Sequence, residues 1–393
     1  MLIGLIGKPN CGKSTFFKAS TLANVEIGNR PFVTVAPNHG VGYVKVDCID
    51  KEFKVQCNPN HGFCLNHKRF VPVDLMDVAG LVPGASEGKG LGNQFLDELR
   101  NADVFIHIVD ASGTTDVEGK PTEGYNPCND IRFLEDELNK WFYNILMKVW
   151  KSFARKTEME HLKFSEAVAK QFSGLKVTEE NVKDVLRKSK LPERASTWKD
   201  EQVMKFASEL RGLSKPMIIA ANKCDMPDAE ENIKKMENEF PEYLIYPCSA
   251  DSELALREAS KVGLIDYIPG ENHFEIKGKL TKGQEQALEK IKKNVLEVYK
   301  GTGVQEILNL AVFDFLKYIA IFPAGAHKLA DSKGRILPDC FLLPPGSTAL
   351  DFAYYLHTDF GKNFIKAIDA RSKQAKGKDY VLKNRDALEI VCR

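Results

Sequence analysis

The sequence lacks any apolar run that approaches the ~18 residues of a membrane-spanning helix. Its first residues, MLIGLIGKPN, also lack the charged start and the small-residue cleavage site of a secretory signal. These absences predict a cytoplasmic protein that has no membrane partner.

Neither sign of charge is in excess, since 55 Lys and Arg residues stand against 54 Asp and Glu residues. No global field therefore indicates a nucleic acid or a membrane surface, and any basic patch must be local. The nine cysteines are an odd number spread over the whole length, which is typical of reduced thiols rather than of a disulfide framework. The length of 393 residues predicts two or three domains.

The first stretch that carries chemistry is a strand, a glycine-rich loop and a helix. The apolar run LIGLI precedes GKPNCGKST, residues 7–15, and FFKASTL follows with a helical pattern. Gly7 and Gly12 fit the GxxxxGKS pattern, in which backbone N–H groups converge on phosphates at a helix N-terminus. We expect Lys13 to reach the β- and γ-phosphates and Ser14 to ligate Mg²⁺. The nucleotide-binding residues predicted here are Asn10, Cys11, Gly12, Lys13, Ser14 and Thr15.

Two further segments follow in the order found in nucleotide switches. Thr34 lies in the loop-like RPFVT and is predicted to close over Mg²⁺ and the γ-phosphate. The alternating strand VPVDLMD ends at Asp77, where its carboxylate can hold Mg²⁺ through water, and the N–H of Gly80 is expected to contact the γ-phosphate. Ser14, Thr34 and Asp77 are therefore the predicted magnesium residues.

A later segment predicts which base is bound. The apolar strand PMIIAAN delivers Asn222, Lys223 and Asp225 at its carboxyl end, and YPCSA adds Ser249 and Ala250, whose backbone is expected to contact guanine O6. The carboxylate of Asp225 can accept from both N1–H and the exocyclic amine of guanine, a donor pair that adenine lacks. The segment therefore indicates GTP and GDP as ligands.

Together these segments resemble a known family. GKPNCGKSTFF, RPFVTVAPNHGVGYV, DVAGLVPGA and ANKCD are similar to the Obg-like branch of the translation-factor-class GTPases, and within it to the YchF subfamily. The resemblance spans nearly the whole chain, and ILPDCFLLPPGSTALDFAYYLHTDFGKNFIKAIDA resembles a TGS domain, a small β-grasp module. It implies an α/β fold: a P-loop NTPase G domain with an inserted α-helical hairpin domain and a C-terminal β-grasp TGS domain. It also implies a ribosome-associated switch. Many members have lost the guanine motif and resemble ATPases, so the NKCD of this chain is a departure.

The positions of these motifs divide the chain into three predicted domains. The G domain is expected at 1–125 and 214–304, the helical insertion at 126–213 and the TGS domain at 305–393. Within the insertion, apolar residues recur at spacings of three and four, which predicts one stripe on a helix of about five turns or more. We expect this stripe to pack within its own domain; a partner-binding surface is the alternative. Its members are Ile131, Leu134, Leu138, Trp141, Ile145, Val149 and Phe153.

The end of the chain carries a local excess of positive charge. Residues 361–393 hold nine Lys and Arg but four Asp and Glu, and the aromatic residues Phe360, Phe364 and Tyr380 lie beside or among them. Such a tract can contact the phosphates and bases of RNA, which favours the ribosome or ribosomal RNA as a partner. The alternative is an ordinary solvated face.

Leu81 occupies the position where many nucleotide switches carry the glutamine that orients water. A leucine side chain cannot hydrogen-bond water, so either GTP hydrolysis is slow and assisted, or the protein is a nucleotide sensor or YchF-like ATPase with little turnover. Asn10 is a candidate ligand for an assisting K⁺; its alternative role is to fix the loop through backbone bonds. The residues predicted to act in hydrolysis are Lys13, Thr34, Gly80 and Asn10.

One cluster lies outside the nucleotide motifs. Cys57, His61, Cys64 and His67 place two thiols and two imidazoles within eleven residues. Tetrahedral Zn²⁺ accepts that ligand set, although the spacing is tighter than in the usual zinc finger. A structural zinc site and a polar hairpin tip are both open, and the family resemblance supplies no metal here.

Overall fold

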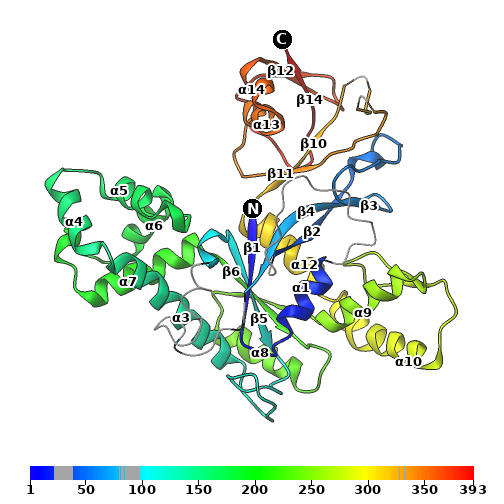
Figure 1. Cartoon of the computed structure of the whole chain (residues 1–393), viewed down its shortest axis with the longest axis horizontal. Coiled ribbons are helices and arrows are strands. Elements are labelled where there is room, and N and C mark those ends of the chain that lie inside the picture. Colours follow the sequence, from blue (N-terminus) through cyan, green and yellow to red (C-terminus); the bar gives the residue numbers. More distant parts are fainter. Residues whose placement is uncertain (22–38, 79, 81–83, 85–97, 327, 332) are drawn as a thin grey trace.

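The computed structural model describes residues 1–21, 39–78, 80, 84, 98–326, 328–331 and 333–393 (Figure 1). Thr34 and Leu81 lie outside these residues.

A seven-stranded sheet forms the centre of the molecule, in the order β2-β4-β1-β5-β6-β7, with β3 paired to β4. Strands β4, β1, β5, β6 and β7 pair in parallel, whereas β2 and β3 run antiparallel to β4. Parallel pairing brings the carboxyl ends to one edge, where Asp77 lies opposite Leu5 and Asn222 opposite Asp110. The strands are β1 (Leu2–Ile6), β2 (His39–Asp47), β3 (Phe63–Leu65), β4 (Lys68–Asp77), β5 (Val104–Asp110), β6 (Met217–Asn222) and β7 (Leu244–Pro247).

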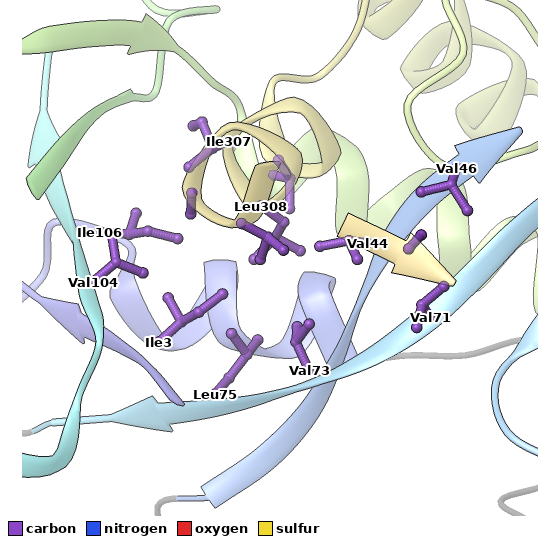
Figure 2. Packing of buried hydrophobic residues seen from close by; sticks show 14 of the residues in the cluster. Ile3, Val44, Val46, Val71, Val73, Leu75, Val104, Ile106, Ile307 and Leu308 are labelled. Atoms are coloured by element: carbon purple, nitrogen blue, oxygen red, sulfur yellow. The ribbon is translucent and has the colours of Figure 1, made fainter. Parts of the chain in front are cut away.

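Helices cover this sheet and close its core. Helix α1 (Lys13–Thr21) packs on β2 and on the helices α9 (Ala250–Lys261) and α12 (Val304–Asn309). Figure 2 shows side chains from the strands converging with those of α12, and burial of each is worth about 1.5–3 kcal/mol. In a second cluster of buried hydrophobic residues, α8 (Ala229–Glu239) packs against β5 and β6. The labelled core residues are Ile3, Val44, Val46, Val71, Val73, Leu75, Val104, Ile106, Ile307 and Leu308.

The insertion is helical, as expected, and lies to one side of the sheet (green in Figure 1). The expected apolar stripe is divided between two helices, because the first ends at Met147 and Val149 leaves helical geometry at φ −127° and ψ −6°. Phe153 therefore belongs to the next helix, whose Trp150 stacks on Trp198 with ring centroids 5.5 Å apart. The helices are α3 (Cys128–Met147), α4 (Trp150–Met159), α5 (Phe164–Gln171), α6 (Glu179–Lys188) and α7 (Asp200–Ser214). None of the helices in the described ranges has the length and apolar content to span a membrane.

The C-terminal domain is a second sheet, in the order β11-β10-β14-β12-β13. Ile321, Leu343, Phe352 and Leu388 lie in its own small core, as a β-grasp module requires. The helix α12, by contrast, packs in the G-domain core, and the boundary that we propose at residue 305 falls within it. The elements are β10 (Ile319–Pro323), β11 (Phe341–Leu343), α13 (Ala349–Leu356), α14 (Thr358–Lys362), β12 (Phe364–Asp369), β13 (Ala375–Lys376) and β14 (Ala387–Cys392).

An extension with its own small apolar cluster lies between α9 and α12 along the chain. It follows α9 and leads to α12 through a two-stranded ribbon and a helix that contains one π-helical turn. Its elements are β8 (Ile265–Asp266), β9 (Glu275–Ile276), α10 (Lys282–Ile291) and α11 (Glu297–Tyr299).

Candidate functional site

The glycine-rich loop between β1 and α1 is shaped by close backbone approaches. Gly12 adopts φ +93°, and a Cβ added there would lie 2.1 Å from Nδ2 of Asn222. Gly7 adopts φ +153°, and a Cβ there would lie 2.5 Å from the carbonyl oxygen of Ile108. Only glycine fits both positions, which is why the pattern read from the sequence folds as a tight phosphate-binding loop.

The predicted residues from the loop and from the guanine motif line one cavity of about 520 Å³, a size usual for a small-molecule site. Cys11 and Ala250 are the exceptions, because the side chain of Cys11 is fully buried behind the loop and Ala250 is buried at the start of α9. Burial raises the pKa of the Cys11 thiol to about 11, so the thiol stays protonated at neutral pH. The predicted residues that line the cavity are Asn10, Gly12, Lys13, Ser14, Thr15, Asn222, Lys223, Asp225 and Ser249.

The predicted magnesium residues of the described chain meet at the end of β4. The hydroxyl of Ser14 donates to Oδ2 of Asp77 over 3.2 Å, and Nζ of Lys13 lies 3.1 Å from Oδ1 of the same carboxylate. A hydroxyl and a carboxylate are the hard oxygen donors that Mg²⁺ prefers, so this pair fits the ion. Gly80 passes directly against the loop, since an added Cβ would lie 2.8 Å from the backbone nitrogen of Pro9.

The guanine motif is held by its own hydrogen bonds. Oδ1 of Asp225 accepts from the hydroxyl of Ser249 over 2.8 Å, which fixes the carboxylate at the cavity wall. The N–H of Ala250 donates to Oδ1 of Asn222 over 3.0 Å, so in this structure it serves the motif rather than a ligand. The ammonium of Lys223 donates to Oδ2 of Asp110 over 2.7 Å.

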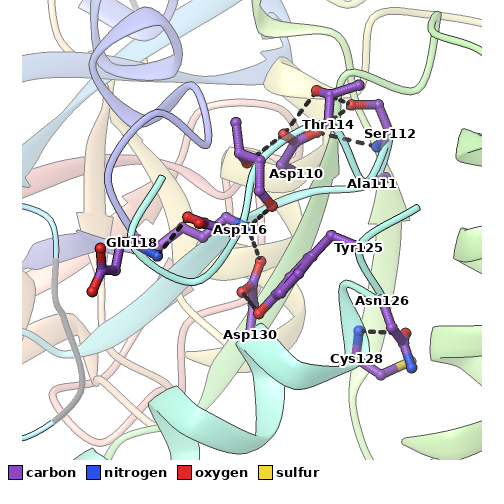
Figure 3. A network of polar contacts seen from close by, with 12 residues as sticks. Asp110, Ala111, Ser112, Thr114, Asp116, Glu118, Tyr125, Asn126, Cys128 and Asp130 are labelled. Atoms are coloured by element: carbon purple, nitrogen blue, oxygen red, sulfur yellow. Dashed lines mark hydrogen bonds and ion pairs between the residues drawn. The ribbon is translucent and has the colours of Figure 1, made fainter. Parts of the chain in front are cut away.

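Asp110 is a site residue that the sequence reasoning missed. Its side chain is fully buried and accepts from Lys223 and Thr115. It also accepts from the hydroxyl of Ser112, as Figure 3 shows. Burial opposes ionisation, but these hydrogen bonds outweigh it and hold the pKa of this carboxyl below its usual value. The available signal was an acidic residue at the carboxyl end of an apolar strand, the same signal that identified Asp77.

Lys8 is a second residue that was missed, and it ties the loop to the helical insertion. Its buried ammonium lies 2.8 Å from Oδ2 of Asp130, in the first turn of α3, and donates to the carbonyl oxygen of Thr115 over 2.7 Å. The hydroxyl of Tyr125 donates to the other oxygen of Asp130 over 2.9 Å, as Figure 3 shows. No pattern in the sequence joins Lys8 to a carboxylate that lies so far along the chain.

Asn10 adopts φ +59° and donates from Nδ2 to the carbonyl oxygen of Gly119 over 2.9 Å. This bond fixes the loop, in line with the alternative role for Asn10. The hydrogen bond to Gly119 uses only the amide nitrogen of Asn10. A cation would need the amide oxygen, which takes no part in this bond.

The predicted cysteine and histidine cluster needs a correction. Ligand atoms of Cys48, Asp50, Cys57 and Cys64 lie within 4.8 Å of one another, whereas neither predicted histidine belongs to that group. His61 is exposed and pairs with the amide of its neighbour Asn60. His67 instead contacts Asp50, 2.9 Å from Nδ1 to Oδ1. Cys48 was missed because it lies outside the eleven-residue window; antiparallel pairing of Asp47 with Lys68 brings it beside the hairpin.

Comparisons with known proteins agree with this geometry. The chain matches the family models for a 50S ribosome-binding GTPase over residues 2–144, for the G4 motif-containing domain of an Obg-like YGR210-like GTPase over 220–325, and for the TGS domain over 327–392. It is 48% identical to a GTP-binding protein, MJ1332, of Methanocaldococcus jannaschii over 99% of this chain and 98% of that one. It is 27% identical to the ribosome-binding ATPase YchF of Bacillus subtilis over 98% of both chains. The chain belongs to the Obg-like family of GTP-binding proteins. The expected Obg-like family and the expected fold class are thereby confirmed.

The same fold is also seen in a solved structure. The crystal structure of a GTP-binding protein from Pyrococcus horikoshii OT3 covers the whole of both chains with a TM-score of 0.78 and 40% identity. The three-part architecture of this chain is therefore shared over its full length.

Proposed function

We propose that this chain is a GTP-binding molecular switch of the cytoplasm that hydrolyses GTP slowly and acts on the ribosome. The observation that carries the proposal is the guanine motif at the same cavity as the phosphate loop, with Asp225 fixed by Ser249. A carboxylate has about four acceptor positions, so the bond from Ser249 leaves Asp225 able to accept from both guanine donors. An adenine base would offer no donor pair to the remaining acceptor positions of that carboxylate, which is unfavourable in a partly closed site.

The part of the cavity beside the phosphate loop supports the same proposal. Lys13 and Ser14 both contact Asp77, which supports binding of the triphosphate and its Mg²⁺ at this end of the cavity. When bound, Mg²⁺ would neutralise charge that develops on the phosphate oxygens. On nucleotide binding, the ammonium of Lys13 exchanges the carboxylate of Asp77 for phosphate oxygens, and Thr34 is the residue that we propose to report the γ-phosphate.

The proposed ribosome contact rests on exposed residues of the TGS domain, here called the TGS face. Lys362, Lys366, Lys378 and Lys383 are exposed, and Phe360 and Ile365 expose 44% and 51% of their surface nearby in sequence. Basic and apolar side chains mixed on one small domain suit phosphate and base contacts with RNA. A relative named as a ribosome-binding ATPase adds support.

The second candidate function is a nucleotide sensor or ATPase with little turnover. It is favoured by Leu81, which cannot orient water, and by the ATPase named among the relatives. A single-turnover measurement of [γ-³²P]GTP and [γ-³²P]ATP hydrolysis, with and without ribosomes, separates the two. The proposal expects GTP hydrolysis that ribosomes accelerate at least about tenfold. Hydrolysis of ATP alone, or of neither nucleotide under both conditions, would support the second candidate.

A further inference from the structure

A compact group of thiols lies at the far end of β2 and β4, apart from the nucleotide cavity. Cys48 follows β2, Asp50 lies in a short 3₁₀ turn (Ile49–Lys51), Cys57 lies in the following loop and Cys64 lies in β3. Their four ligand atoms are mutually within 4.8 Å. Cys48, Cys57 and Asp50 are almost fully buried, and Cys64 is half-buried.

The spacing of the group is that of a tetrahedral metal site. Zn–S bonds of about 2.3 Å place two ligand sulfurs about 3.8 Å apart in a tetrahedron. Here the Sγ atoms of Cys48 and Cys57 are 3.7 Å apart, and Sγ of Cys64 lies 3.9 Å from Oδ2 of Asp50. A disulfide would need about 2.05 Å between sulfurs, so these cysteines are separate thiols.

The fourth ligand is held in place by surrounding bonds. The side chain of Asp50 has no exposed surface; its Oδ1 pairs with His67, and its Oδ2 accepts from the backbone N–H of Cys57 over 3.1 Å. Bonds of this kind orient a metal ligand. His67 thus acts on the group through Asp50, which differs from the ligand role expected from the sequence.

We propose that Cys48, Cys57, Cys64 and Asp50 bind one structural Zn²⁺ ion. Three soft thiolates favour zinc over Mg²⁺ or Ca²⁺, which prefer oxygen ligands. Four protein ligands in a nearly closed site leave no open position, so the ion is structural rather than catalytic.

The zinc would organise the surface on which the TGS domain rests. Between β2 and β3 the chain forms only one 3₁₀ turn, yet the N–H of Asn58 donates to Ile336 O over 2.8 Å and that of Asn60 donates to Pro338 O over 2.7 Å. In the same segment Glu52 pairs with Arg371 and Arg385 of the TGS domain. A metal that fixes residues 48–64 therefore fixes the contact between the two domains.

The test begins with the metal content of the full-length, tag-free protein, purified under reducing conditions and reconstituted with one equivalent of ZnSO₄ before gel filtration. Mass spectrometry of the metals should find about one zinc per chain, and titration of the thiols with an organomercurial should release it. Less than a tenth of an equivalent of zinc would overturn the proposal. So would a Cys48–Cys57 disulfide in the freshly purified protein.

Variants then test the ligand set. Cys57→Ser and Cys64→Ser should each lower bound zinc at least tenfold, whereas Cys392→Ser, a half-exposed thiol outside the group, should keep full zinc. Asp50→Asn should weaken zinc affinity more than His67→Gln does. Full zinc in Asp50→Asn, with loss in His67→Gln, would overturn Asp50 as the fourth ligand.

If the variants fail to fold, hydrogen exchange of the unmodified chain still tests the proposal. Removal of zinc by a chelator should speed hydrogen exchange at the amides of Asn58 and Asn60 at least tenfold, while exchange in β1 and β5 stays unchanged. Equal exchange at Asn58 and Asn60 before and after zinc removal would overturn the role of the ion in holding the TGS domain.

Discussion

Asn222 donates from Nδ2 to the carbonyl oxygen of Cys11 over 2.9 Å and so joins the guanine motif to the phosphate loop. The other end of the same amide accepts from the N–H of Ala250 and from the thiol of Cys248. One buried side chain thereby sets the distance between the parts of the cavity that meet base and phosphates. Such preorganisation lowers the entropy that the protein would otherwise lose on binding.

We expect Asn222→Ala to lower GTP affinity at least about tenfold and the free energy of unfolding by about 1–3 kcal/mol, because backbone groups lose buried partners. Calorimetric titration with GTP and urea unfolding measure the two effects. Asn232→Ala is the matched control, since Asn232 also donates to a backbone carbonyl, that of Ala111, but does not line the cavity. GTP affinity that falls equally in both variants would contradict the joining role of Asn222.

Glu306 predicts a pH dependence of stability near neutrality. Burial raises the pKa of Glu306 from 4.5 to about 7. A carboxyl whose pKa is higher in the folded state binds more protons there, so the free energy of unfolding falls as pH rises from about 4.5 through 7. Glu306→Gln should therefore leave stability near pH 4.5 almost unchanged and raise it at pH 8 by roughly 2–3 kcal/mol. Urea unfolding at both pH values measures this, with the exposed Glu297→Gln as control. An identical pH profile for the Glu306→Gln variant and the parent would refute it.

Asn10 predicts an effect of the monovalent cation. Because the bond to Gly119 uses the amide nitrogen, the amide oxygen can ligate K⁺ beside the β- and γ-phosphates and supply positive charge in the transition state. We expect faster GTP hydrolysis in KCl than in NaCl at equal ionic strength, and expect Asn10→Ala to abolish the difference while GTP binding persists. Single-turnover rates in the two salts measure it. Equal rates for the unmodified chain would assign the missing water alignment to a backbone group or to a partner.

The TGS face predicts salt-dependent binding to ribosomes. Deletion of residues 305–393 would remove Ile307 and Leu308 from the G-domain core, so charge reversal of exposed lysines is the cleaner test. Lys366→Glu with Lys378→Glu should weaken ribosome co-sedimentation and reduce the salt slope by about 1 per lost phosphate contact.

The control for this prediction is a matched pair on another part of the chain. Lys282→Glu with Lys290→Glu changes two exposed lysines of α10 by the same charge. An equal loss in both double variants would indicate nonspecific attraction and argue against a TGS docking face.

The phosphate loop and the guanine motif could be predicted from sequence because their function requires fixed residues directly after short apolar strands. Parallel pairing then brings Asp77 and Asn222 to one edge, whatever the intervening chain does. The link from Lys8 to Asp130 could not be predicted, since it depends on where the first turn of α3 lies. The thiol group was predicted with two histidines that lie outside it, because strand register, rather than spacing along the chain, brings Cys48 to it and leaves His61 exposed.

The measurement that tests the central claim most directly is the affinity of the full-length chain for GTP and for ATP, with Mg²⁺, by calorimetric titration. The account predicts that GTP binds at least about tenfold tighter than ATP, and that Asp225→Asn lowers GTP affinity and raises that for xanthosine triphosphate. Asp228→Asn, on the same loop but exposed, should bind GTP as the parent does. Equal affinity of the parent for GTP and ATP would contradict the reading of guanine by Asp225.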